Sequence, residues 1–433
     1  MPATKDRDTI KGLMPGEKPS RRPPSFWDGN FKINPLSTFI ICFPPLVTLF
    51  GLATGVEVQL KTVLTAIAFL WFNGLGITVG YHRLFSHCSY VAHWTVQAFW
   101  IFAGAGALQG SAKWWARNHR IHHRYVDTDL DPYNALRGFG FSHLGWMIMK
   151  QDYENLGHAD MTDLNLNKIV QWQHKYYFPL SMLSSIILPT LICGLGWGDW
   201  AGGYCYAAMA KAMCLHHFTF FINSLAHSNF FWATQSVTDE HTAHDSPVCA
   251  LMTFGEGYHN FHHEFAQDYR NGLKWYQYDP SKWIIRSLEV VGLAWNLHRT
   301  PNSVVERSKS NLKHKQLSAE IKHHEKKIDA HERSVAAPTM WTKKDVAEKV
   351  AAGRKLIILG DYVLDLEKTV PTGAGYTHQN KDVNWYNVHP GGRKVLDSYV
   401  GKDATEAMTG GVYKHRAGAF TLIAHLRVAS LKK

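Results

Sequence analysis

Four long apolar stretches limit what this 433-residue chain can fold into more than any other feature. They are residues 36–54, 62–80, 177–197 and 203–226. A helix needs about 20 apolar residues to cross a hydrocarbon core roughly 30 Å thick, so each stretch is long enough to span a membrane. Short connections join the first stretch to the second and the third to the fourth. The chain is therefore predicted to form two transmembrane hairpins.

Lysine and arginine residues predict the orientation of these hairpins. The segment before the first stretch is rich in them, whereas the hairpin connections contain almost none. Because cytosolic flanks carry this excess, both termini are expected in the cytosol and the hairpin tips in the lumen. The net charge of +11 fits an anionic membrane surface or an anionic substrate. The sequence has no zinc-finger spacing and no RNP-like segment, so we expect no nucleic-acid partner.

Histidines are concentrated beside these stretches in HRLFSH (82–87), HRIHH (119–123), HNFHH (259–263) and NSLAH (223–227). Residues three and four apart share a helix face. His119 can therefore share a metal-facing side with His122 or with His123. The third box, at 259–263, offers the same two choices.

The pair in HRLFSH has a different spacing. His82 and His87 are five residues apart, which is a turn of about 140° in a regular α-helix. They can converge only if the helix ends or bends there, or if they serve two metals. All the boxes together supply nine imidazoles, which is too many for one transition metal and suits two ions. Imidazole ligands suit zinc, copper, iron or nickel.

Other histidines near the apolar stretches are expected to be ordinary hydrogen-bonded residues. They are His93, His143, His158, His174, His216 and His217.

The boxes and their surroundings resemble the membrane acyl-CoA desaturases of the stearoyl-CoA (Δ9) type, and the fungal enzymes in particular. The resemblance lies in GITVGYHRLFSH, GSAKWWARNHRIHHRYVDTDLDPY, GEGYHNFHHEF and DYRNGLKWYQYDPSKW, and it covers about residues 30–298. It implies a mainly α fold with four transmembrane helices and a cytosolic helical cap, in the endoplasmic reticulum membrane.

The resemblance also implies a site with two iron ions. Its ligands would be His82, His87, His119, His122, His123, His227, His259, His262 and His263, with Asn223 reaching iron through a water. Carboxylates that orient the imidazole N–H groups are expected nearby. The candidates are Asp127, Asp131, Glu256 and Glu264.

The implied substrates are an acyl-CoA and O₂. Arg117 and Lys150 match positions that hold the CoA portion in the family, and Trp115 and Thr219 match residues that line the bent acyl channel. Gly74 matches a position near the closed end of that channel, where a small residue should leave room for a stearoyl chain.

The composition changes after residue 298. Residues 299–340 are expected to be a charged linker, and residues 341–433 a small α+β domain. HPGG (389–392), GKDAT (401–405) and GGVYKH (410–415) resemble the cytochrome b5 haem-binding domain. The resemblance implies haem b with His389 and His415 as axial ligands. Two histidine ligands leave no open position on the iron, which suits electron transfer. An NADH-cytochrome b5 reductase is the expected partner, beside membrane lipid.

Several segments depart from the family pattern. Residues 228–247 replace an aromatic, glycine-rich turn, and VPTGAGYTHQNKDVNW (370–385) adds residues before the haem histidine. Asn118 stands where relatives often have aspartate, and Arg416 where serine is common. Residues 1–30 are a polar tail without the apolar core of a signal peptide.

The expected function is oxygen-dependent insertion of a cis double bond, at Δ9 of stearoyl- or palmitoyl-CoA, with electrons delivered through the fused b5-like domain. Two alternatives remain open. One is a related membrane di-iron hydroxylase or acyl-lipid desaturase. The other is a non-enzymatic membrane metal-binding protein, which should carry histidines in mid-span along a conduction path.

Overall fold

The computed structural model describes residues 32–151, 156–230, 232–335, 339–370, 383–389, 391–411, 415 and 423–432. The polar tail (1–30), most of the 370–385 insertion and Arg416 lie outside these residues. The chain divides into two compact units, Met1–Lys313 and His314–Lys433.

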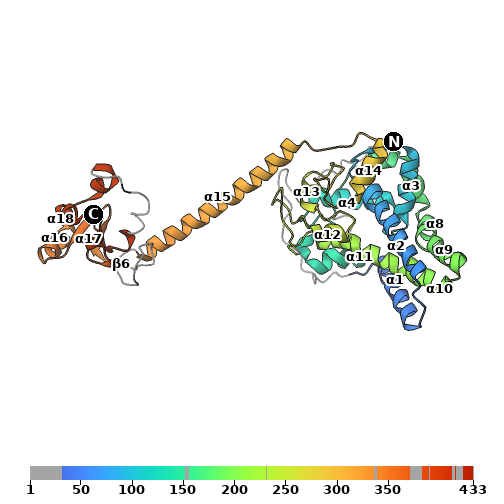
Figure 1. The fold of residues 1–433 in the computed structure, drawn as a ribbon, viewed down its shortest axis with the longest axis horizontal. Coiled ribbons are helices and arrows are strands. Elements are labelled where there is room, and N and C mark those ends of the chain that lie inside the picture. The colour runs from blue at the N-terminus through green and yellow to red at the C-terminus, as the bar shows by residue number, and fades with distance from the viewer. Residues whose placement is uncertain are drawn as a thin grey trace. The chain divides into compact units, whose positions relative to one another are not determined.

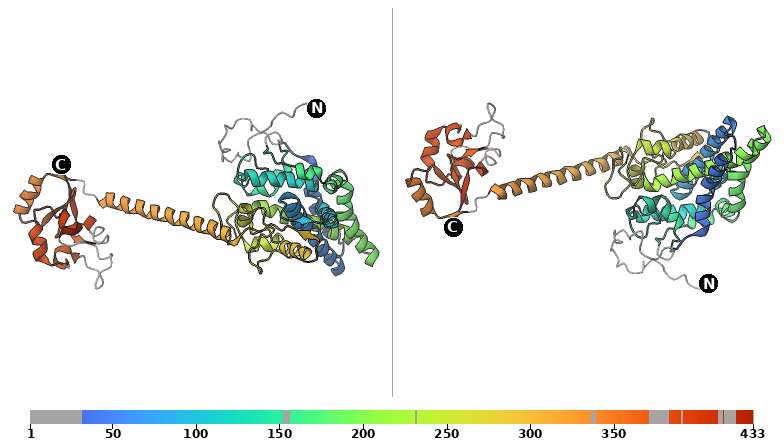
Figure 2. Two further views of the ribbon diagram at one scale, coloured as in Figure 1. Left: turned by 90° about the horizontal axis from the view of Figure 1, so that it is seen from above. Right: turned by 90° about the horizontal axis from the view of Figure 1, so that it is seen from below.

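The first unit is almost entirely helical. Its elements are α1 (Pro35–Ala53), α2 (Leu60–Leu75), η1 (Gly76–Ser86), β1 (Val91–Ala92), α3 (Trp94–Ala105), α4 (Ala112–Tyr125), η2 (Ala135–Arg137), η3 (Phe141–Gly145), α5 (Trp146–Ile148), α6 (Thr162–Leu166), α7 (Lys168–Lys175), α8 (Tyr177–Met182), η4 (Leu183–Ile187), α9 (Leu188–Trp197), α10 (Trp200–Gly202), η5 (Gly203–Ala210), α11 (Lys211–Ser224), α12 (Pro247–Met252), α13 (His259–Glu264), α14 (Pro280–Val290) and β2 (Ala294–Trp295). α1, α2, α8 and α9 lie on one side of this unit, and α4, α12 and α13 on the other (Figures 1 and 2).

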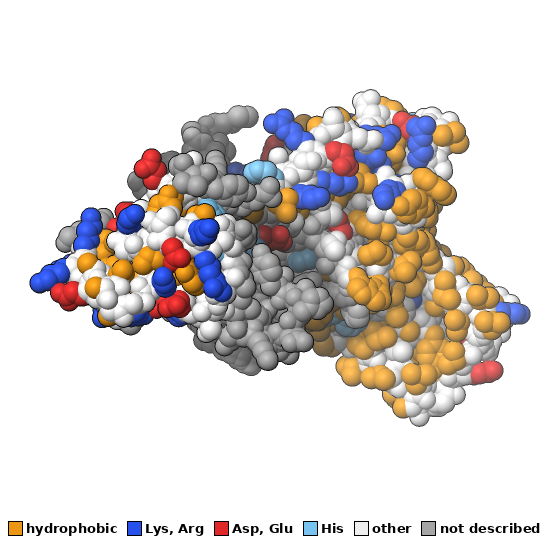
Figure 3. Space-filling model, turned by 60° about the vertical axis from the view of Figure 1, so that its left-hand side comes forward, with side chains coloured by type: hydrophobic (Ala, Val, Ile, Leu, Met, Phe, Trp, Pro, Cys, Tyr) orange, Lys and Arg blue, Asp and Glu red, His pale blue; other side chains and the backbone are white. Residues whose placement is uncertain are grey.

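Three helical runs are long and apolar enough to cross a membrane. They are Pro35–Ala53, Leu60–Ser86 and Tyr177–Trp197, and they coincide with three of the four predicted spans. Large apolar side chains on α1 and α2, such as Leu46, Phe50 and Leu64, are exposed. Figure 3 shows hydrophobic side chains gathered over one continuous part of the surface, with few charges among them. The unit therefore presents a lipid-facing surface.

The fourth predicted span is helical but less apolar than the others. α10, η5 and α11 form one run from Trp200 to Ser224, which packs against α1, α2 and α9. It carries Lys211, whose Nζ donates to Asn73 Oδ1 (3.0 Å) and Ser185 Oγ (2.9 Å), and it is not among the three apolar runs. Because protein surrounds much of this run, polar side chains find partners there.

The second unit is built on a small mixed sheet with the strand order β3-β8-β5-β4. The strands are β3 (Met340–Trp341), β4 (Leu356–Leu359), β5 (Tyr362–Asp365) and β8 (Arg427–Leu431), and β6 (Thr369–Val370) pairs with β7 (Val383–Asn384). The helices are α16 (Lys343–Ala351), α17 (Trp385–Val388), α18 (Arg393–Tyr399) and η6 (Ala407–Gly411). β3 runs parallel to β8, whereas β4–β5 and β5–β8 are antiparallel. The helical first unit and this α+β second unit confirm the predicted fold class.

The charged segment predicted as a linker forms α15 (Asn302–Val335). Val305 and Leu312 near its start are buried, and Val305 packs with Phe261 and Val237 of the first unit. The first turns of α15 therefore belong to the core of that unit.

Candidate metal centre and substrate cavity

The winding of η1 brings the first two histidines together. A π-helix closes its hydrogen bonds between residues five apart, and the amide of His87 donates to the carbonyl oxygen of His82 over 3.1 Å. The two ring centroids lie 4.8 Å apart. The helix ends at Ser86, which is one of the alternatives that the spacing allowed, and its wider winding reduces the rotation that would separate the pair in an α-helix.

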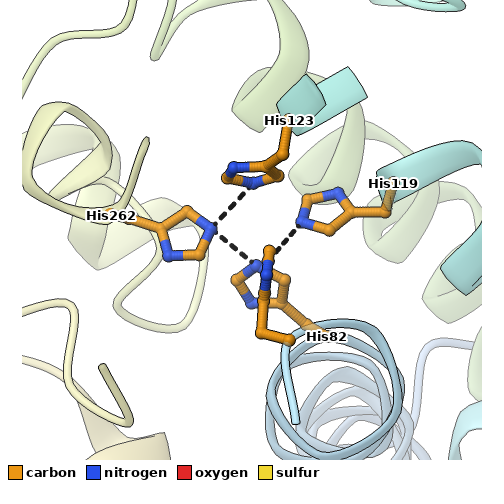
Figure 4. A group of neighbouring side chains, drawn as sticks. His82, His119, His123 and His262 are labelled. Atoms are coloured by element: carbon orange, nitrogen blue, oxygen red, sulfur yellow. Dashed lines mark hydrogen bonds between the residues drawn. The ribbon is translucent and has the colours of Figure 1, made fainter. Parts of the chain in front are cut away.

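The nine box histidines gather into two groups. The first group contains His82, His87, His119, His123 and His262, and the second contains His122, His227, His259 and His263. α4 and α13 contribute in opposite ways, because the i, i+4 pair of α4 joins the first group and that of α13 joins the second. The remaining histidine of α4, His122, belongs to the second group, and the remaining histidine of α13, His262, belongs to the first. Figure 4 shows four imidazoles of the first group turned toward one another from three separate segments.

The distances within each group fit ligands of one metal ion. The Nε2–Nε2 distances are 2.9 Å for His82–His262 and His87–His119, 3.0 Å for His259–His263, 3.1 Å for His123–His262, and 3.2 Å for His122–His263 and His227–His259. Two nitrogens bound about 2.1 Å from one metal at right angles lie about 3 Å apart. Two facing neutral imidazoles share at most one proton, so a cation between them satisfies nitrogens that the protein alone leaves without a donor.

Five imidazoles, drawn from both groups, are held in the neutral form that metals bind. Burial, followed by repulsion from neighbouring rings, lowers the pKa of His119, His123, His259, His262 and His263 well below the usual histidine range. Neutral rings have a free nitrogen lone pair, so no proton has to be displaced before a metal enters.

Two of the four predicted carboxylates touch a box histidine directly. Glu256 Oε2 lies 2.9 Å from His82 Nδ1, and Asp131 Oδ1 lies 2.9 Å from His122 Nδ1. A carboxylate at Nδ1 holds the proton there and leaves Nε2 free for a metal. Burial raises the pKa of Glu256, but the neighbouring Arg83 and His82 outweigh this effect and lower it overall.

The other two predicted carboxylates are placed differently. Asp127 acts through Thr242: its Oδ1 accepts a 2.6 Å hydrogen bond from the Thr242 hydroxyl, which lies 2.9 Å from His227 Nδ1. Thr242 lies in the unusual 228–247 stretch, so that stretch supplies a partner to the second group. Glu264 is exposed, and among the described residues it makes no contact with an imidazole.

Two arginines that the sequence interpretation missed hold these elements in place, and Arg83 is buried while Arg120 is half-buried. Arg83 Nη2 contacts Glu256 Oε1 and Asp279 Oδ1, each at 2.9 Å. Arg120 donates from Nε to the Ser86 carbonyl (2.9 Å) and from Nη2 to the Phe85 carbonyl (2.7 Å), the two residues before His87.

Arg120 uses its other donors on Asp160, just before α6, and on Asp163 in the first turn of α6. It contacts the Asp160 carbonyl and both oxygens of Asp163, each at 2.7 Å. All five N–H groups of its guanidinium are therefore occupied. The signal that could have found both arginines is the His-Arg pair that opens HRLFSH and HRIHH.

Several other histidines make the ordinary hydrogen bonds expected of them. His143 lies 3.0 Å from both Ser224 Oγ and His217 Nδ1, and His174 Nδ1 lies 2.7 Å from Ser111 Oγ.

A cavity leads to the first of the two histidine groups. Its volume is about 560 Å³ including its open mouth, and its walls include His82, His119, Asn223 and Glu256. The predicted channel residues Trp115 and Thr219 also line it. Its other walls are Ile77, Thr78, Gln109, Trp114, Tyr133, Trp146, Met147, Phe220 and Ile222. Gln109, which the sequence interpretation missed, donates from Nε2 to Thr219 Oγ1 over 2.9 Å.

The remaining predicted substrate residues lie outside the walls of this cavity. Gly74 is buried against Phe254, and a Cβ at this glycine would lie 2.7 Å from the Phe254 ring. Arg117 is half-buried on α4, and Lys150 is exposed after α5.

In the second unit, His389 and His415 face one another. Their ring centroids lie 6.3 Å apart, and two imidazoles bound at about 2 Å on opposite sides of one metal would have centroids about 6 Å apart. His415 Nδ1 lies 3.2 Å from the Met408 carbonyl, which leaves Nε2 for a metal. This pair therefore fits the predicted haem ligands.

Comparison with known proteins agrees with this arrangement. Residues 60–295 match the fatty acid desaturase family, and residues 382–432 match the cytochrome b5-like haem/steroid binding domain. The chain is 39% identical to Acyl-CoA desaturase 1 of Saccharomyces cerevisiae over 402 residues, which are 93% of this chain and 74% of the relative. It is also 39% identical to the probable acyl-CoA desaturase of Schizosaccharomyces pombe, over 92% of this chain and 78% of the relative.

Animal proteins match the first unit. Stearoyl-CoA desaturase 5 of Bos taurus is 32% identical over 279 residues, which are 63% of this chain and 82% of the relative. The family match covers more than half of the chain, and the two fungal relatives extend it through the b5-like region. The chain therefore belongs to the fatty acid desaturase family and carries a cytochrome b5-like domain at its C-terminal end.

Proposed function

We propose that the chain is an oxygen-dependent acyl-CoA desaturase that inserts a cis double bond at Δ9 of stearoyl- or palmitoyl-CoA. The observation that carries this proposal is a pair of adjoining imidazole groups, the first of which lines a narrow cavity together with Trp115 and Thr219. The names of the curated relatives, which include acyl-CoA and stearoyl-CoA desaturases, agree with it.

The nine box histidines would hold two iron ions, five on one and four on the other. Iron bound in this way activates O₂, so that hydrogen can be removed from an unactivated methylene group. The second group has one imidazole fewer, and Asn223, near the end of α11, lies four residues before its His227 and lines the cavity. We assign Asn223 the remaining position, reached through a water.

The residues of the chain itself position the substrate and keep the site dry. The aromatic walls of the cavity exclude water from the reacting carbons. The bond between Gln109 and Thr219 fixes part of the cavity wall, so the acyl chain would follow the shape of the cavity. Arg117 and Lys150 would bind the anionic CoA portion outside it. Gly74 and Phe254 would close the far end.

Electrons would arrive through haem b, held between His389 and His415 in the second unit. An NADH-cytochrome b5 reductase would reduce it. We place the protein in the endoplasmic reticulum membrane with both termini and the metal groups in the cytosol, because lysine and arginine precede the first span.

The test uses purified full-length protein with NADH, a b5 reductase, O₂ and stearoyl-CoA. About two irons per chain and an oleoyl product are expected, and a His259→Ala sample should form no product. A hydroxylated product would indicate the related hydroxylase, and product formed only on lipid-linked chains an acyl-lipid desaturase. Metal flux into vesicles without any altered acyl chain would support the metal-binding alternative.

A further inference from the structure

An exposed aromatic surface on the first unit has no role in the proposed function. It contains Trp94, Trp275, Trp283, Val290, Val291 and Trp295, and we call it the aromatic patch. Trp275 is 83% exposed and Val290 is 73% exposed. A contiguous apolar surface of this kind on a folded protein marks a contact with a partner or a membrane.

Two distant segments build the aromatic patch as one surface. β1 and β2 pair antiparallel, with Val91 opposite Trp295. The indole N–H of Trp283 donates to the carbonyl oxygen of Trp275 over 3.3 Å. The patch is therefore part of the folded unit, on and around α14.

α14 has two different faces. Ile285 is fully buried, and the hydroxyl of Ser281 donates to Thr78 of η1 over 2.7 Å. Trp283 and Val290 lie on the outward face, next to Arg286. A helix with aromatic and aliphatic residues on one face and basic residues at its edge is typical of helices that lie in the membrane interface.

Helix α3 connects the aromatic patch to the lipid-facing surface of the spans. Trp94 begins α3, and Phe99 of the same helix is exposed and packs edge-on against Phe72 of α2, with centroids 5.6 Å apart. α2 is part of an apolar run long enough to cross the membrane. A surface joined to a lipid-facing helix in this way meets the same bilayer.

The chemistry of the aromatic patch selects the headgroup region rather than the hydrocarbon core. Tryptophan is enriched at membrane interfaces, where its ring is shielded and its N–H remains hydrated. Lys274 and Arg286 lie beside these tryptophans and are exposed, and Arg286 is paired with Glu289. Cations at this depth are attracted to anionic lipids.

We propose that the aromatic patch is a membrane-interface anchor that seats α14 in the headgroup layer of the bilayer. α14 packs against η1, which carries His82 and leads to His87. The anchor therefore fixes the depth of the metal groups relative to the lipid surface from which an acyl chain enters.

The test places the photocrosslinking residue p-benzoylphenylalanine at position 283 or 290 of the full-length chain. The protein is reconstituted in nanodiscs of phosphatidylcholine and phosphatidylserine, irradiated and examined by mass spectrometry. The matched control is position 321 in α15, where Ile321 is 59% exposed. Haem absorbance and desaturation of stearoyl-CoA check that each variant is folded.

Phospholipid adducts at positions 283 and 290, several-fold above those at position 321, are expected. Adducts to a second copy of the chain, or lipid adducts no more frequent than at position 321, would overturn the proposal. The two positions are tested in separate variants, so if one variant fails to fold, the lipid adducts of the other still test the proposal.

Discussion

The carboxylate of Glu256 lies 2.9 Å from Nδ1 of His82 and also accepts hydrogen bonds from Arg83 and Asn271. A Glu256→Gln variant keeps the shape but loses the charge that holds the His82 proton. Iron affinity or turnover should fall about 10- to 100-fold. Iron per chain by mass spectrometry and product formation measure this effect. Glu264→Gln is the matched control, because Glu264 is exposed, and equal losses in both variants would contradict the assignment.

Substitution of two adjacent histidines on α4 should remove different iron ions. His122 belongs to the group of four imidazoles, and His123 to the group of five. His122→Ala should therefore deplete one iron and His123→Ala the other, since each removes a ligand from one group only. Anomalous diffraction at the iron edge locates the metal that remains. Loss of the same iron in both variants would show that the groups are divided differently.

Arg120 should be a positioning residue that lysine cannot replace. Lysine offers three donors at one point, whereas the guanidinium of Arg120 reaches the carbonyls of Phe85 and Ser86 and the side chain of Asp163 together. Arg120→Lys should lower iron occupancy in the group that contains His87, while the KM for stearoyl-CoA stays unchanged. Arg124→Lys is the control. An unchanged iron content in Arg120→Lys would refute this role.

The bond between Gln109 and Thr219 should set how well the acyl chain is held. Thr219→Val keeps the volume but leaves the Gln109 amide without its partner, at a cost of about 1–3 kcal/mol. We expect a lower kcat/KM for stearoyl-CoA and more double bonds at neighbouring positions. Product analysis by mass spectrometry measures both. Wild-type kinetics with a single product would exclude a role for this bond.

Removal of either haem ligand should block internal electron delivery without harming the first unit. His389→Ala and His415→Ala should lose haem absorbance and NADH-dependent turnover, whereas His425→Ala should keep both. Added soluble cytochrome b5 should restore turnover to the two deficient variants, because their metal groups are intact. Failure of this rescue would mean that the second unit has a role beyond electron transfer.

The histidine spacings indicated a two-metal site, but they could not show which histidines bind which metal. Positions three and four after His119 are equally good on one helix face, and only the packing of α4 against η1 decides between His122 and His123. The π-helical winding of η1 also could not be predicted from the sequence. It depends on tertiary contacts of Gly76 and Gly80 with α3 rather than on the helix propensity of the local sequence.

Interactions between distant segments were the hardest to predict. Asp127 reaches His227 only through Thr242, which lies 115 residues away from it in the chain. Glu256 and Glu264 looked equivalent beside the third box, and only the fold buries one and exposes the other. Composition indicated four spans, and three of them are helical runs apolar enough to cross a membrane, because their surfaces face lipid. The fourth run is less apolar because other helices replace lipid around it.

The π-helical winding of η1 ties the number of residues between two ligands to the shape of the backbone that carries them. His82 and His87 converge because their five-residue spacing matches the winding of a π-helix and not that of an α-helix. Deleting one of the three residues 84–86 would give an i, i+4 pair, which an α-helix presents on one face. Such a deletion would keep the two histidines together only if η1 also changed from π-helical to α-helical winding. The number of residues between the two histidines can therefore change only together with the winding of the helix.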